Sequence, residues 1–151
     1  MSTEALPLLG KVALVTGSSR SIGAAIVKRL AADGAMVVVN YVTTKDAAEA
    51  LVQEINAEGK GKAIALQADM SSLAEGNRLV EETVQRLGRL DILVLNAAHM
   101  VLQQLEELDE EQYDRHFMIN VKVPLFMTQT AAKYLTTGSS PFYPEYIFDA
   151  C

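Results

Sequence analysis

Residues that build cross-links and metal sites are scarce in this sequence. Its 151 residues include one cysteine, Cys151, two histidines and no tryptophan. A single thiol cannot form an internal disulfide, and His99 and His116 lack metal-ligand partners at a workable spacing. We therefore expect no metal site, and the cysteine usage indicates a reducing, cytoplasmic location.

Long apolar runs and an excess of positive charge are also missing. No apolar stretch reaches the length of about 18 residues that a membrane-spanning helix needs. The first ten residues lack the pattern of a secretory signal. The formal net charge is −6, whereas nucleic-acid backbones demand a basic face. The sequence thus predicts no membrane and no nucleic acid among its partners.

The sequence does contain a regular alternation of apolar runs and amphipathic segments. Hydrophobic residues make up 50% of it and charged residues 21%, which is typical of a globular domain. Short apolar runs predict buried strands at residues 12–15, 36–39, 63–66 and 91–95. Apolar spacing predicts helices at residues 24–32, 45–58, 72–87 and, with a bend at Pro124, 109–134. Strands that alternate with helices form a parallel, doubly wound sheet.

The loop from Thr16 to Gly23 lies between the first predicted strand and the first predicted helix. At such a turn, unpaired backbone N–H groups and the helix dipole attract a phosphate. Glycines at positions 17 and 23 would let a pyrophosphate come close. The loop therefore predicts a bound dinucleotide, with an ordinary strand-to-helix turn as the alternative.

The end of the second predicted strand indicates which dinucleotide is bound. Sites for NAD usually place an acidic residue there, which accepts a hydrogen bond from the ribose 2′-hydroxyl. This chain has Asn40 and Tyr41 instead, and Arg20 in the loop could donate to a 2′-phosphate. These residues favour NADP(H). The alternative is that Arg20 is a solvated surface charge and Asn40 a turn former.

Two further polar residues follow predicted strands directly. Asp69 comes after the third strand and Asn96 after the fourth. Ligands of open α/β sheets bind at the carboxyl ends of strands, so their shared position favours the site. A capping or turn role would explain either residue alone.

Together these residues resemble the short-chain dehydrogenase/reductase family. The family's Thr-Gly-x-x-x-Gly-x-Gly loop matches residues 16–23, and its Asn-Asn-Ala-Gly motif matches residues 95–98. Its acidic residue near the adenine matches Asp69, and its active-site asparagine matches Asn120. The resemblance covers about residues 10–140. It implies an α/β fold with a Rossmann-like doubly wound parallel sheet of about four strands, in the order 3-2-1-4 and truncated after the fourth.

The resemblance also implies an NADP(H)-dependent oxidoreductase. Residues 40–44 look like those of NADPH-preferring ketone reductases of fungal polyketide pathways, so a small-molecule ketone is the expected substrate. Asn120 would be a supporting catalytic residue. The residues expected to bind the coenzyme are Gly17, Ser19, Arg20, Ser21, Ile22, Gly23, Asn40, Tyr41, Asp69 and Asn96.

The chain departs from the family pattern in three places. Ser21 replaces the second loop glycine, and Leu95 and Ala98 replace an asparagine and a glycine of the second motif. The family's catalytic serine and Tyr-x-x-x-Lys, which normally follow the asparagine helix, have no counterpart here. The spacing of Tyr41 and Lys45 matches Tyr-x-x-x-Lys by coincidence, because that pair lies on the adenosine side.

We therefore divide the chain into a flexible N-terminus (1–9), an NADP(H)-binding domain (10–135) and an irregular tail (136–151). The tail contains two prolines and no strand-like alternation, so the fourth strand is predicted to form an open edge. The chain by itself is expected to be inactive or nearly so. The alternatives are a remnant or mis-spliced product that at most binds nucleotide or an intact relative, and an NADP(H) sensor. The resemblance also makes the last helix a candidate surface for homo- or hetero-oligomers.

Overall fold

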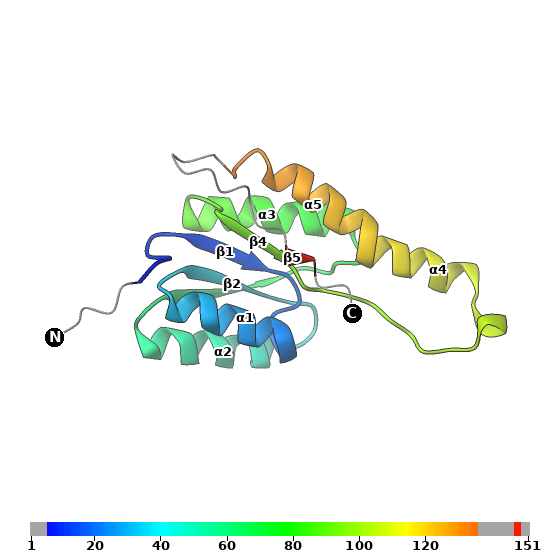
Figure 1. Ribbon diagram of the computed structural model, residues 1–151, viewed down its shortest axis with the longest axis horizontal. Coiled ribbons are helices and arrows are strands. Elements are labelled where there is room, and N and C mark those ends of the chain that lie inside the picture. Colours follow the sequence, from blue (N-terminus) through cyan, green and yellow to red (C-terminus); the bar gives the residue numbers. More distant parts are fainter. Residues whose placement is uncertain (1–5, 136–146, 149–151) are drawn as a thin grey trace.

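The computed structural model describes residues 6–135 and 147–148, which form one parallel sheet with helices on both faces (Figure 1). The sheet has the order β3-β2-β1-β4-β5, so the predicted order 3-2-1-4 is confirmed. The strands are β1 (Val12–Val15), β2 (Met36–Tyr41), β3 (Lys62–Gln67), β4 (Ile92–Leu95) and β5 (Ile147–Phe148).

Helices α1 and α2 cover one face of the sheet, and α3 and α5 cover the other (Figure 1). None of the helices in the described ranges combines the length and apolarity needed to cross a bilayer. The helical segments are α1 (Ser21–Ala32), α2 (Lys45–Glu58), α3 (Leu73–Leu87), η1 (Leu105–Glu107), α4 (Glu110–Phe117), η2 (Met118–Lys122) and α5 (Val123–Ala131).

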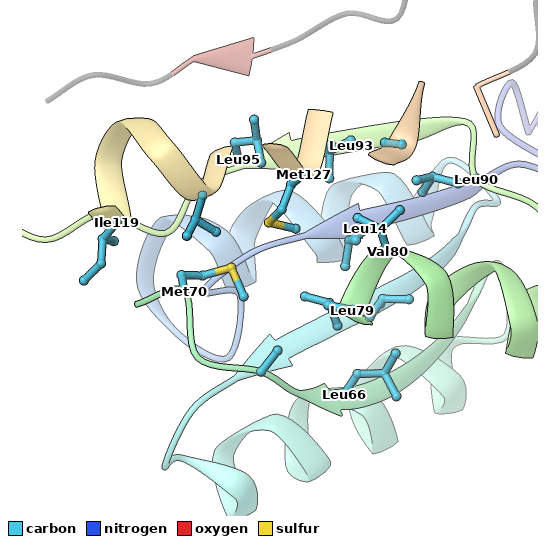
Figure 2. Packing of buried hydrophobic residues seen from close by; sticks show 14 residues of the cluster. Leu14, Leu66, Met70, Leu79, Val80, Leu90, Leu93, Leu95, Ile119 and Met127 are labelled. Atoms are coloured by element: carbon cyan, nitrogen blue, oxygen red, sulfur yellow. The ribbon is translucent and has the colours of Figure 1, made fainter. Parts of the chain in front are cut away.

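The central strand β1 shows why the sheet is parallel and covered twice. All four of its residues are fully buried, as expected for a strand with helices on both sides. Successive side chains point to opposite faces. Leu14 packs with α3 and α5, whereas Ala13 and Val15 pack with α1 and α2. Figure 2 shows the first of these clusters, where Leu79 and Val80 of α3 meet Leu14.

The helix ends follow the local sequence signals. Ser72 caps α3, because its Oγ accepts a hydrogen bond from the Glu75 N–H at 3.3 Å. Gly88 ends the same helix with a φ of 82°. Residues 7–10, at the end of the predicted N-terminal lead-in (1–9), form a turn. The Leu8 N–H in this turn donates to the Asp33 carbonyl at 2.9 Å.

The last predicted helix is interrupted in an unexpected place. Asp109 caps its start by accepting a hydrogen bond from the Gln112 N–H at 2.8 Å. A bend was predicted at Pro124, but the irregular turn is the π-helical segment η2, and Pro124 sits in the first turn of α5. Proline is tolerated there because the first turn does not need its missing N–H. Single π-helical turns are frequent at functional sites.

The two ends of β4 are held by different contacts. At the start of β4, the partly buried Asp91 carboxylate accepts hydrogen bonds from Arg89 at 2.6 and 2.8 Å and from the Val12 N–H at 2.9 Å. At its end, β4 pairs with β5. The prediction of an irregular tail and an open edge at β4 is therefore wrong at Ile147 and Phe148, whose backbone extends the sheet. The rest of the predicted tail lies outside the described residues.

Candidate nucleotide-binding site

The glycine loop crosses the carboxyl end of β1 in the predicted strand–turn–helix context. Gly17 has a φ of 61°, which suits glycine. Gly23 allows α1 to approach β4 closely, since a Cβ there would lie 2.7 Å from the Asn96 Nδ2. A larger residue at either position would push the loop away from the strand ends.

Asn40 lies beneath the loop, where its side chain is fully buried. Its Oδ1 accepts a hydrogen bond from the Gly17 N–H at 2.8 Å. Its Nδ2 donates to the carbonyls of Leu66 at 3.3 Å and Ala68 at 3.1 Å. The amide thus joins the loop to the ends of β2 and β3, whereas contact with a coenzyme stays a prediction for this residue.

Asn96 fixes the loop from the β4 side. Its Nδ2 donates to the carbonyls of Thr16 at 2.9 Å and Gly17 at 3.2 Å. The Thr16 hydroxyl in turn accepts a hydrogen bond from the Ala97 N–H at 3.0 Å. Asn40 and Asn96 therefore hold the same loop from opposite sides, and both side chains do so with their amide groups.

The outer part of the loop carries the groups that remain available to a ligand. Ser21 has a φ of 51° and so keeps the left-handed backbone of the glycine that it replaces. Arg20 is exposed and makes no ion pair within the part of the chain that the structure describes. The Ser19 hydroxyl lies 2.8 Å from the Thr44 hydroxyl, at the N-terminus of α2. This group of hydroxyls and one cation suits an anion such as a phosphate.

A shallow cavity of about 430 Å³ opens beside the ends of β2 and β3. It is lined by Val42, Thr43, Gln67, Asp69, Glu75 and Arg78. Asp69 sits at its edge and has a structural role as well, because its Oδ1 accepts a hydrogen bond from the Ser71 N–H at 2.8 Å.

Tyr41 ends β2 on the same side, and the Lys45 ammonium pairs with Glu49 at 3.5 Å. Tyr41 and Lys45 thus lie on the side on which an adenosine was predicted.

Asn120 lies in the π-helical segment η2, apart from the loop. Its Oδ1 accepts a hydrogen bond from the His99 N–H at 2.8 Å, and its Nδ2 donates to the His99 carbonyl at 2.8 Å. The backbone of His99 therefore connects the segment that follows Asn96 to η2, the part of the predicted last helix that carries Asn120. Within the described ranges, no three potential metal-ligating side chains gather.

Sequence reasoning missed two features of this site. The spacing of Ile22 with Ile26 and Leu30 predicts that it shares their apolar helix face, but its side chain is 55% exposed at the loop. His99 and His116 were treated as lone residues, whereas their ring centroids lie 4.8 Å apart. No local pattern could reveal that pair, because it depends on how the segment after β4 folds back onto α4.

A comparison with protein-family models matches residues 11–140 to the short chain dehydrogenase model. The chain belongs to the short-chain dehydrogenase family. An uncharacterized oxidoreductase of Methylorubrum extorquens is 53% identical over 133 residues, which are 88% of this chain and 53% of that protein. A probable tetrahydroxynaphthalene reductase of Zymoseptoria tritici is 45% identical over 85% of this chain and 48% of its own length.

A solved structure gives the same fold. The short-chain dehydrogenase of Burkholderia cenocepacia in complex with NADP is 43% identical, with a TM-score of 0.82 over 85% of this chain and 52% of that one. The chain thus spans about half the length of the relatives that it matches. That half contains the glycine loop, the carboxyl ends of strands β1 to β4 and the helical segment that carries Asn120.

Proposed function

We propose that this chain forms the NADP(H)-binding half of a short-chain dehydrogenase-type oxidoreductase. One observation carries the proposal: the side-chain amides of the buried Asn40 and the partly buried Asn96 hold the glycine loop, while the exposed Arg20 at its outer edge makes no ion pair with the described residues. The complex of the Burkholderia cenocepacia relative with NADP supports the choice of coenzyme.

Preference for NADP(H) over NAD(H) would come from the 2′-phosphate. Arg20, Ser19 and the N-terminus of α2 provide a cation, a hydroxyl and unpaired N–H groups. The partly exposed residue at the end of β2 is Tyr41, which would not repel this phosphate as an acidic residue would. In this proposal Asp69 lies at the adenine and Ser21 and Ile22 at the pyrophosphate.

The test is a titration of the purified chain with NADPH and NADH, followed by nucleotide fluorescence. Replacing Arg20 by Gln should weaken NADPH binding by about 10- to 100-fold, the usual effect of losing a charge-assisted contact, and leave NADH binding unchanged. Arg29→Gln is the matched control, because Arg29 lies in the last turn of α1, away from the loop, and pairs with Asp33 at 2.9 Å. Absence of saturable NADPH binding by the unaltered chain would overturn the proposal.

For the reaction, we propose reduction of a ketone by hydride from NADPH. In the 151 residues, Asn120 is the member of the family's catalytic set that can be matched, so we expect these residues alone to bind NADPH without appreciable turnover. The probable tetrahydroxynaphthalene reductase of Zymoseptoria tritici supports a fused-ring aromatic substrate. Fusing residues 10–135 to the remaining half of the Methylorubrum extorquens relative should give NADPH oxidation with a bicyclic aromatic ketone. A folded chimaera without such activity would contradict this substrate class.

The last helix offers a surface for assembly with a second copy or an intact relative. Four apolar side chains that are four residues apart are each about half exposed, namely Tyr113, Phe117, Val121 and Leu125. Such a stripe is typical of an interface. Light scattering should show a dimer that Leu125→Glu converts to a monomer, and a monomeric unaltered chain would refute the assembly.

The low cysteine content supports a cytoplasmic location, which cell fractionation would test.

A further inference from the structure

His99 and His116 form a cluster that coenzyme binding does not use. His99 follows the Asn96 turn, and His116 lies in the last turn of α4. Their rings meet edge to face, with an interplanar angle of 62° and centroids 4.8 Å apart. Both side chains are half-buried where the segment after β4 meets α4.

The imidazole of His116 bridges two backbone groups. Its Nδ1 lies 2.9 Å from the Gln112 carbonyl oxygen, which can only accept, so Nδ1 carries the hydrogen. Its Nε2 is then the acceptor for the Val101 N–H, at 3.4 Å. One neutral tautomer satisfies both contacts, whereas an imidazolium would turn a second N–H toward the Val101 donor.

The same three-residue stretch is held from its other end by Asn120. The Asn120 amide makes two 2.8 Å hydrogen bonds with the backbone of His99, one as acceptor and one as donor. Residues 99–101 are thus held between η2, through Asn120, and α4, through His116. Without the His116 contact, only the hydrogen bonds with the His99 backbone would orient the Asn120 amide.

We propose that neutral His116 is a positioning residue, which clasps residues 99–101 onto α4 and so orients the Asn120 amide, and that its protonation opens this clasp. The functional meaning rests on the proposed role of Asn120, but the clasp itself can be measured without coenzyme.

The geometry of the His116 contact makes it sensitive to acid. The charged groups that act on the neighbouring His99 are Arg115 and His116 of α4. Burial first, and then the charges of Arg115 and His116, lower the pKa of His99 from its ordinary value. Nε2 of His116 can accept the Val101 hydrogen bond only while it carries no proton, so acid shifts the equilibrium to the open form, by at most about tenfold per pH unit.

Hydrogen exchange of the free chain, followed by NMR between pH 7.5 and 5.5, tests the clasp. The protection factor of the Val101 amide should fall by about tenfold or more as the pH is lowered, and the Asn120 side-chain amide signals should shift with the same midpoint. The core amide of Val38 should show no such change. Val101 protection that does not vary with pH in the unaltered chain would overturn the proposal.

Variants separate the clasp from general packing. His116→Gln keeps an acceptor but cannot titrate, so Val101 should stay protected at both pH values. His116→Leu should leave Val101 unprotected throughout, and His99→Phe, which keeps the ring contact, should retain the pH dependence. Protection of Val101 in a folded His116→Leu chain would refute the proposal, and the pH series decides if that variant does not fold. An NADPH titration of the same samples is independent, because failed binding with an intact clasp would contradict only the proposed function.

Discussion

Replacing Asn40 by leucine tests how far the site depends on one buried amide. The side chain has no exposed surface, and it makes hydrogen bonds with Gly17, Leu66 and Ala68. Leucine has a similar size but can satisfy none of these three backbone groups. The glycine loop would then lose its side-chain connection to the ends of β2 and β3 and keep the two hydrogen bonds between Ser18 and the backbone of residue 40, at 2.9 and 3.0 Å.

The expected cost follows from the groups left without partners. The partly buried Gly17 N–H left without its partner costs about 1–3 kcal/mol, and each lost neutral hydrogen bond to a carbonyl costs about 1 kcal/mol. The apolar contacts of leucine return part of this. We expect Asn40→Leu to lower the free energy of unfolding by about 3 kcal/mol, a large share of the stability of about 5–15 kcal/mol that domains usually have.

Urea unfolding followed by circular dichroism measures this difference. Asn56→Leu is the matched control, because the Asn56 amide makes the same kind of two-sided contact, with the N–H and C=O of Ala63 at 2.8 and 3.2 Å. Asn56 is exposed, so water can replace its contacts and the cost should stay below about 1 kcal/mol. Equal losses in the two variants, or a loss below 1 kcal/mol for Asn40→Leu, would refute the reasoning.

Three further substitutions test other positions by urea unfolding. Ser21→Gly should change the stability by at most about 1 kcal/mol, in the stabilising direction, because relief of the left-handed backbone outweighs glycine's entropy. Gly76→Ala should destabilise by about 1–3 kcal/mol, since its methyl group would lie 2.8 Å from Val123. Asp91→Asn should cost about 2 kcal/mol at pH 7. Burial raises the pKa of Asp91, but the hydrogen bonds from Arg89 and Val12 and the charges of Arg89 and Lys11 together lower it by more, so that the pKa lies below its ordinary value. The difference in stability between the unaltered chain and Asp91→Asn is present at neutral pH and should vanish only in strong acid, below that pKa. A stabilised Gly76→Ala, a destabilised Ser21→Gly, or an Asp91→Asn difference that persists in strong acid would contradict them.

The fold could be predicted because its signals are local and repeated. Apolar runs such as Val12–Val15 can be buried on both faces only in a covered parallel sheet, and each is followed by a turn and an amphipathic helix. The glycine loop was recognisable for the same reason, since its strand and helix adjoin it in the sequence. Family motifs then gave the order of the strands, which the structure confirms.

The remaining features depend on contacts between distant residues. A glycine inside a helix such as Gly76 predicts a local weakness from the sequence alone, but here it is buried where α3 meets Val123 and Met127 of α5. No sequence signal marks the π-helical turn at residues 118–122, because the extra residue is accommodated by tertiary packing. Asn40 was interpreted as a coenzyme contact from its place at a strand end. Its partners Leu66 and Ala68 lie 26 and 28 residues further along the chain.

Asn40→Asp separates the structural role of this position from a role in coenzyme choice. An acid at the end of the second strand usually favours NAD by binding the ribose. Here the new oxygen would instead face the carbonyls of Leu66 and Ala68, where Nδ2 now donates at 3.3 and 3.1 Å. Burial should raise the pKa of this carboxyl, and its protonated form can donate to a carbonyl. The variant should therefore be destabilised at pH 8 and regain stability toward pH 5, because the folded state holds the proton more tightly. Unfolding in urea across this range measures the change, and nucleotide titrations should show an unaltered preference for NADPH over NADH. A stable variant that binds NADH more tightly than NADPH would show that residue 40 reaches the ribose, contrary to its buried position in the structure.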